Sequence, residues 1–454
     1  MTAVLPARPA AAASTQPLPR LIGAELEVPL VTGDRVRYAN LDLAASAPAL
    51  AGVADHVTEL LPFYASVHRG AGYASQVCTA VLEQARETVG RFVGARGDDV
   101  VVFTRNTTDA LNLLAGCVPG RVLRLDVEHH ANLISWRTGR VLPAAPTVAQ
   151  TLADLRAALA AEPTALLAVT GASNVTGEIL PLAEITAIAH AAGARVVVDA
   201  AQLAPHRRID IAGAGIDYLA LSGHKLYAPY GAGALVGRRD WLDDATPYLA
   251  GGGAVRAVAV PNASGVSEVT WAAAPHRHEA GTPNVLGAAA LAQACRCLDA
   301  VLDDALDHER ALLARLETGL AAVPGVRTLN VWPDATDRVA VASFVVDGYP
   351  AGLVAAVLSA EHGIGVRDGK FCAHPLLARL AGTADGCAVR ASLGLSTSTS
   401  DVDRLVEGVR ALVADGPGWD YAVVDGRWTP VPDPRPADPL GVGLTGLLAP
   451  GCGG

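Results

Sequence analysis

The chain has 454 residues, 51% of them apolar, and a formal net charge of −10 at pH 7. This apolar content is ample for a large core, whereas a negative charge without a long basic run argues against a nucleic-acid partner. No segment is predicted to provide the roughly 18 apolar residues of a membrane span. Seven cysteines without regular spacing predict free thiols in the cytoplasm and no disulfide framework.

The composition divides the chain into four predicted parts. Residues 1–35 are interpreted as a disordered leader, because the Ala- and Pro-rich start lacks the charged and apolar blocks of a secretory signal. Residues 36–290 form a large α/β domain, and residues 291–415 form a long helix with a smaller C-terminal α/β domain. The Pro- and Gly-rich tail, residues 416–454, is either a docking strap or partly disordered.

Short apolar runs alternate with helical patterns through the large domain. The predicted strands are Val100–Phe103, Val122–Leu125, Ala165–Val169, Arg195–Asp199, Asp217–Leu221 and Ala232–Gly237. This alternation predicts a doubly wound, mostly parallel sheet, whose ligands bind beyond the C-terminal strand ends. Residues 245–284 are predicted to be an extended loop region, and a long helix, perhaps in two pieces, follows from Leu286 to about Val323.

Lys225 stands where a predicted strand opens into a loop, and Lys370 is the other lysine of the chain. Arginine takes nearly all other basic positions, so a lysine here indicates chemistry that a guanidinium cannot perform. An amine can lose its proton and form a Schiff base with an aldehyde. The alternative is a structural lysine whose stem covers the strand end.

Other polar residues follow strand ends in the same way. Asp199 ends a Val-rich strand, where a buried carboxylate needs a cationic partner such as a protonated pyridine nitrogen, or else an arginine. Thr107 and Thr108 open a helix, which suits a phosphate or an ordinary N-cap. Ser222 and His224 would add donors to that phosphate.

His129 lies in the triplet Glu128-His129-His130 at another strand end. Its ring is suited to stacking on an aromatic cofactor, and a metal site is the alternative. Adjacent histidines point apart and no HExxH or CxxC pattern supports metal, so we expect no metal ion.

Taken together, these motifs resemble the fold-type I pyridoxal phosphate enzymes of the class V aminotransferase family, and most of all the group II cysteine desulfurases and selenocysteine lyases. The resemblance covers about residues 38–413. The motifs that carry it are Arg105–Ala110, Glu128–Asn132, Ser173–Gly177, Asp199–Gln202, Ser222–Tyr227, Glu279–Asn284 and Arg390–Ser392.

The resemblance implies pyridoxal 5'-phosphate as the cofactor and a role for each matching residue. Lys225 would hold the cofactor covalently and then move protons, Asp199 would pair with the ring nitrogen, and His129 would stack on the ring. The ring hydroxyl would be served by Asn174 and Gln202, and the phosphate by Thr107, Thr108, Ser222 and His224. Thr282 would reach the phosphate of a neighbouring subunit, which implies a homodimer with shared sites. Arg390, together with Arg367, would bind the carboxylate of the amino-acid substrate.

The segment Arg367–Pro375 decides between the reactions open to such an enzyme. In the resembling desulfurases, a cysteine at the position of Cys372 takes the substrate's sulfur as a persulfide. Lys370 and His374 are close enough in sequence to lower the pKa of this thiol. The alternative is an incidental cysteine.

The chain departs from the family pattern around the expected substrate pocket. Leu43 and Gly72 replace the usual Asn and His, Ala228 and Tyr230 replace Gly and Thr, and Phe371 replaces a His. None of these replaces an implied cofactor contact, but all can reshape the pocket or the route to a sulfur acceptor.

We therefore expect a lyase that releases sulfur from L-cysteine or selenocysteine to give alanine, with a protein as one possible sulfur acceptor. The alternative is a C–S lyase, an epimerase or an aminotransferase for a specialised amino acid. Each of these would use Lys225, Asp199 and Arg390 but could dispense with Cys372. A non-catalytic cofactor-binding or scaffold protein is a third hypothesis.

Overall fold

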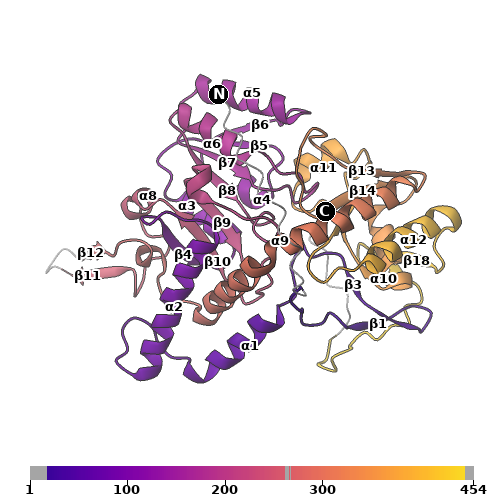
Figure 1. Cartoon of the computed structure of the whole chain (residues 1–454), viewed down its shortest axis with the longest axis horizontal. Helices are drawn as coiled ribbons and strands as arrows, with labels where there is room; N and C mark the ends of the chain where they lie inside the picture. Colours follow the sequence, from indigo (N-terminus) through magenta and orange to yellow (C-terminus); the bar gives the residue numbers. More distant parts are fainter. Residues whose placement is uncertain (1–17, 261–264, 266, 445–454) are drawn as a thin grey trace.

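The computed structural model describes residues 18–260, 265 and 267–444. Two α/β units lie side by side, and the long helix α9 (Val285–Ala321) runs between them (Figure 1). The larger unit contains a seven-stranded sheet and the smaller a four-stranded sheet.

The central sheet has the strand order β4-β10-β9-β8-β7-β5-β6. Its strands are β4 (Val100–Thr104), β5 (Val122–Leu125), β6 (Gly139–Leu142), β7 (Leu166–Thr170), β8 (Arg195–Asp199), β9 (Tyr218–Ser222) and β10 (Gly233–Gly237). All neighbours run parallel except β10, which is antiparallel to both β4 and β9. The predicted doubly wound, mostly parallel α/β fold is confirmed.

Both faces of this sheet are buried because successive residues of a strand point to opposite faces. Val196 and Val198 of β8 join one apolar cluster, whereas Val197 joins the cluster on the other face. The first face is covered by α2 (Tyr73–Phe92), α5 (Val148–Ala161), α6 (Leu182–Ala191) and α9. The second face is covered by α3 (Thr107–Ala115), α4 (His130–Leu133) and α8 (Asp240–Asp244). The short helices α1 (Ala51–Leu60) and α7 (Ile211–Ala214) complete this unit.

The smaller unit is an antiparallel sheet in the order β13-β14-β17-β16. Its strands are β13 (Val326–Thr328), β14 (Val341–Val346), β16 (Arg367–Gly369) and β17 (Ala388–Ser392). Helices α10 (Ala351–His362) and α12 (Thr399–Asp415) pack on it in a separate apolar cluster, and α11 (His374–Leu380) joins the large cluster. The parallel pair β3 (Ala39–Asn40) and β15 (Ile364–Gly365) links the N-terminal segment to the smaller unit.

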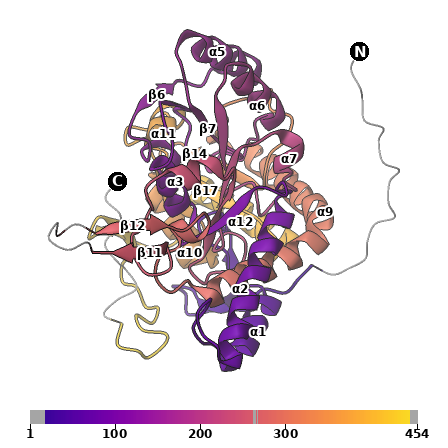
Figure 2. The ribbon, with the colours of Figure 1, turned by 90° about the vertical axis from the view of Figure 1, so that its left-hand side faces the viewer.

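Three segments contain strands that the sequence analysis did not predict. Residues 18–35, in the predicted leader, include β1 (Glu27–Pro29), which pairs with β2 (Arg35–Arg37); residues 1–17 lie outside the described part. The predicted loop 245–284 contains a hairpin, β11 (Val255–Ala259) and β12 (Glu268–Trp271), which projects from the body (Figures 1 and 2). The tail forms a second hairpin, β18 (Tyr421–Val424) and β19 (Arg427–Pro430), packed on the smaller unit. In each case the pairing partner lies nearby in the chain, but the strands are too short to give a clear alternating pattern.

Helix α9 is continuous rather than broken into two pieces. By length and composition it could cross a membrane, but 67% of its most apolar window is buried inside the protein. Its apolar character therefore has a sufficient explanation in the packing between the two units.

Candidate functional site

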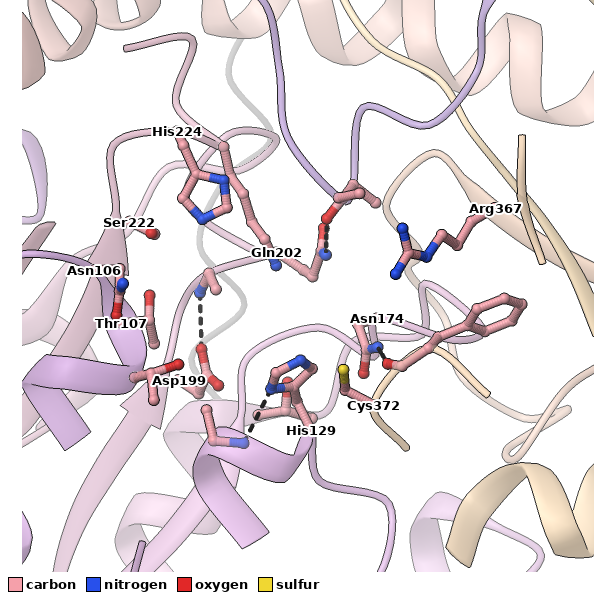
Figure 3. A pocket seen from close by; sticks show the side chains of 18 of the residues that line it. Asn106, Thr107, His129, Asn174, Asp199, Gln202, Ser222, His224, Arg367 and Cys372 are labelled. Carbon is pink, nitrogen blue, oxygen red and sulfur yellow. Dashed lines mark hydrogen bonds between the residues drawn. The ribbon is translucent and has the colours of Figure 1, made fainter. Parts of the chain in front are cut away.

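A cavity of about 340 Å³ lies where β7, β8 and β9 end. Its lining includes every predicted site residue except Thr282: Thr107, Thr108, His129, Asn174, Asp199, Gln202, Ser222, His224, Lys225, Arg367, Cys372 and Arg390. Figure 3 draws 18 of the lining residues, ten of them labelled, around a common space. The large unit supplies the strand-end residues, and the smaller unit supplies Arg367, Cys372 and Arg390.

Lys225 follows β9 and lies half-buried at the base of this cavity. Burial lowers the pKa of its amine to about 8; Asp199 and Cys372 partly offset this effect, and Arg390 adds to it. An amine with this pKa is partly neutral near pH 7, as nucleophilic attack on an aldehyde requires.

Asp199 is buried at the end of β8, where one carboxylate oxygen accepts a hydrogen bond from the Ala201 amide at 3.0 Å (Figure 3). Burial raises the pKa of this carboxyl group, while the Ala201 amide and the charge of Lys225 lower it. Among the described residues no arginine pairs with Asp199. The carboxylate can therefore take a cation within the cavity, such as a protonated ring nitrogen.

The start of α3 contributes an anion site. Asn106 caps this helix by accepting from the Asp109 amide, so Thr107 and Thr108 are its first two residues. The hydroxyl groups of Thr107 and Ser222 are buried and have no hydrogen-bond partner. Two unpaired hydroxyls beside a helix N-terminus fit a phosphate group.

His129 is the N-cap residue of α4, and its Nδ1 accepts a hydrogen bond from the Ala131 amide at 3.1 Å (Figure 3). Burial, assisted by Lys225 and Arg390, lowers the pKa of the ring to about 3. The ring is therefore neutral with its proton on Nε2, which suits stacking on a pyridine ring. The described residues contain no group of three or more His, Cys, Asp and Glu side chains arranged for a metal ion.

Arg390 on β17 is held by three neighbours. Its guanidinium donates to the Asn174 carbonyl and to Asp42, each at 3.0 Å, and lies 5.2 Å from the centre of the Phe371 ring. Its Nε–H is buried without a partner. This fixed fork, beside the exposed Arg367, is suited to binding a carboxylate.

Cys372 is exposed to the cavity in a loop of unusual backbone geometry. Phe371 and Cys372 both have positive φ values, 49° and 54°, which cost free energy for residues with side chains. Two bonds hold the loop: Asn174 donates to the Phe371 carbonyl at 2.8 Å, and the His130 amide donates to the Cys372 carbonyl at 2.8 Å. Such strain is typical of functional sites.

The expectation that Lys370 and His374 act on the Cys372 thiol changes with the structure. Lys370 lies beside Gly386, and its charge partly offsets the burial that raises the pKa of Cys387, so it is directed away from the cavity. His374 packs against His130, with ring centres 4.5 Å apart. Thr282 lies outside the cavity, in a separate hollow with Arg69, Arg239 and Arg256.

The structure also adds residues that the sequence did not single out. Asn106 and Thr170 line the cavity, and Asp42 holds Arg390. Thr170 ends β7 in register with Asp199, so its strand-end position was a usable signal. Asp42 and Arg390 are 348 residues apart, and nothing in the sequence pattern links them.

The comparisons with known proteins agree with this arrangement. Residues 39–405 match the family described as "Aminotransferase class-V". The chain is 37% identical over 398 residues to a cysteine desulfurase of Dickeya dadantii (84% of this chain, 93% of the relative) and 36% identical over 400 residues to a probable cysteine desulfurase 2 of Mycobacterium leprae (84% and 92%).

Solved structures of cysteine desulfurases share the fold. One is the apo protein from Thermococcus onnurineus NA1, with a TM-score of 0.76 at 30% identity over 88% of this chain and 99% of that one. Another is CsdA (S-sulfonic acid) from Escherichia coli, with a TM-score of 0.72 at 34% identity, over 83% and 94%. The chain belongs to the class-V aminotransferase family.

Proposed function

We propose that this protein is a pyridoxal phosphate-dependent cysteine desulfurase that releases sulfur from L-cysteine, or selenium from selenocysteine, and leaves alanine. The observation that carries the proposal is the meeting of Lys225, Asp199, Arg390 and Cys372 around one cavity. The names of the relatives support the same activity.

The residues that line the cavity have the chemical groups that the cofactor requires. The unpaired hydroxyls of Thr107 and Ser222, with Thr108 and His224, would hold the phosphate, and Asp199 would hold the ring nitrogen. His129 would cover the ring, and Asn174 and Gln202 would border its hydroxyl group. When bound, the cofactor supplies an electron sink for carbanion chemistry at the amino acid's Cα.

The protein's own groups then divide the work. Arg390 and Arg367 bind the substrate carboxylate and orient the amino acid. The Lys225 amine removes the Cα proton, because its lowered pKa leaves it partly neutral. The Cys372 thiolate attacks the substrate's sulfur, so that an S–S bond forms as the C–S bond breaks. The electron pair of the broken bond stays with Cβ, which takes up a proton, and the carbon skeleton leaves as alanine. A reductant or a protein acceptor then removes the outer sulfur of the Cys372 persulfide.

The six described cysteines are all free, which fits an enzyme of a reducing cytoplasm. We propose a homodimer as the active form. The separation of Thr282 from the cavity of its own chain is the structural support for this assignment.

The test is the formation of alanine and sulfide from L-cysteine by cofactor-loaded protein. We expect Cys372→Ala to lose both products while it retains bound cofactor. Cys387→Ala is the matched control, because this thiol lies in the same unit but outside the cavity lining. Full turnover by Cys372→Ala would contradict the proposal, and cofactor-loaded protein that is inert towards cysteine would favour a C–S lyase, epimerase or aminotransferase of another amino acid.

A further inference from the structure

Glu128 is a buried carboxyl group to which the proposed reaction assigns no role. Only 1% of this residue is exposed to solvent. One carboxyl oxygen accepts from the Asn132 side-chain amide at 2.7 Å, and the other accepts from the Thr170 backbone amide at 3.1 Å. Among the described residues Glu128 forms no ion pair, so its side chain interacts through these two hydrogen bonds.

The two bonds join elements that carry the site. Asn132 lies in α4, which begins directly after His129, and its carbonyl oxygen accepts from the Trp136 indole at 2.7 Å. Thr170 ends β7, in register with Asp199 on β8. The Glu128 carboxyl group therefore ties the turn that presents His129 to the strand beside Asp199.

Burial makes the charged form of this group costly. Burial raises the pKa of Glu128 to about 8; the bonds from Asn132 and Thr170 lower it, and the negative charges of Asp199 and Asp126 raise it. The amide donors of Asn132 and Thr170 offset part of this cost, and each meets a carboxyl oxygen that acts as an acceptor.

We propose that Glu128 is a positioning residue that fixes the His129 ring over the cofactor plane by clamping α4 to the end of β7. The inference rests on the proposed cofactor chemistry of the same site, and it concerns the orientation of His129 rather than any contact of Glu128 with the cofactor. Because Glu128 lies behind the cavity lining, its removal acts through His129.

The test uses the purified full-length protein and pyridoxal 5'-phosphate. Cofactor affinity is measured by absorbance titration, and the visible circular dichroism per bound cofactor reports the asymmetric setting of the ring. Glu128→Gln keeps the shape of the side chain. Its –NH2 group, however, faces an N–H donor of Asn132 or Thr170 where Glu128 presents an acceptor oxygen. We expect the cofactor Kd to rise roughly tenfold and the dichroic band to change.

Glu178→Gln is the matched control. Glu178 is also buried and accepts from the Val331 and Trp332 amides at 2.9 Å each, but it lies outside the cavity lining. Its replacement is expected to lower the melting temperature and to leave the cofactor Kd and dichroism unchanged.

Two further variants separate positioning from folding. Asn132→Ala removes the α4 side of the clamp alone and should change the dichroism in the same direction, which decides the matter if Glu128→Gln does not fold. In a His129→Ala background, Glu128→Gln should have no further effect on the cofactor signal.

Unchanged affinity and dichroism in Glu128→Gln or Asn132→Ala, or an equal effect with and without His129, would overturn the inference. A wild-type protein that takes up no pyridoxal phosphate would instead overturn the proposed function.

Discussion

At the scale of single residues, burial controls the charge states of the groups that line the cavity. Lys225, Asp199 and Arg390 are all placed in surroundings that penalise their charged forms, and burial is the largest influence on the pKa of each. Arg390 offsets this cost with Asp42 and the Asn174 carbonyl. Asp199 keeps a carboxylate for a ligand, and Lys225 shifts towards its neutral form.

The lowered pKa of Lys225 gives a pH dependence with a definite sign. Because the amine must be neutral to attack an aldehyde, the rate of cofactor uptake by cofactor-free protein should rise with pH and level off above about 8, rather than near the ordinary value of 10.5. At pH 7 roughly a tenth of the amine is neutral. Stopped-flow absorbance at several pH values tests this, with Lys225→Ala as a control that forms no Schiff base. A rate still rising at pH 10 would contradict the assigned environment.

Arg390→Lys tests the carboxylate assignment. A lysine keeps the charge but cannot span Asp42, the Asn174 carbonyl and a substrate carboxylate with one planar fork. We expect KM for L-cysteine to rise at least about tenfold, the effect of losing one charge-assisted hydrogen bond, with a smaller change in kcat. The exposed Arg367→Lys should change KM less. Equal effects of the two substitutions would argue against Arg390 as the principal anchor.

At the scale of elements, the C-terminal hairpin lies beyond residue 405, where the family match ends. Trp428 of β19 packs against the cluster under α10, next to Gly352. The Tyr421 hydroxyl and the Gly418 amide both donate to Glu361 at the end of α10, at 2.8 and 3.0 Å. The tail residues 418–430 are therefore a docked part of the smaller unit.

Trp428→Ala should lower the free energy of unfolding by about 2–3 kcal/mol, below the range for a fully buried tryptophan because this side chain is only partly covered. Urea unfolding measures the change. Val423→Ala, in the same hairpin but 56% exposed, should change stability by less than about 0.5 kcal/mol. A similar loss in both variants would mean that the hairpin, rather than the Trp428 contact, is being disrupted.

At the scale of the whole molecule, Thr282 is the one predicted site residue that does not line the cavity of its own chain. This residue lies in a separate hollow lined also by Arg69, Arg239 and Arg256. In the proposed homodimer, a second copy would bring its Thr282 to the start of α3.

We predict a dimer by light scattering and a cofactor Kd roughly tenfold higher in Thr282→Ala, as expected for one lost bond to a charged phosphate. Mixing Thr282→Ala with Lys225→Ala offers a sharper readout at limiting cofactor. Each mixed dimer would contain one site with both an intact Lys225 and an intact Thr282, so activity should recover. A monomeric active enzyme, or no recovery after verified subunit exchange, would refute shared sites.

The sequence by itself determined the fold class and the chemical groups of the large unit's half of the site. Residues such as Asp199, Lys225 and His129 follow apolar strands, and parallel strands bring their C-terminal ends to one edge of the sheet, so proximity followed from local pattern. The sequence also predicts the bounds of α9 and of most strands to within a residue or two, because apolar periodicity is a local property of the sequence.

Only the tertiary structure decided how the smaller unit completes the cavity. The Asp42–Arg390 bond, the Asn174–Phe371 bond and the direction of Lys370 all depend on contacts between distant parts of the chain. Sequence spacing carries no information about such contacts, because the packing of the two units around α9, rather than any local preference, sets which side chains meet. The two hydrogen bonds of Glu128 also depend on the tertiary structure. Glu128 belongs to a motif visible in the sequence, but only the fold shows that Asn132 and Thr170 are its partners.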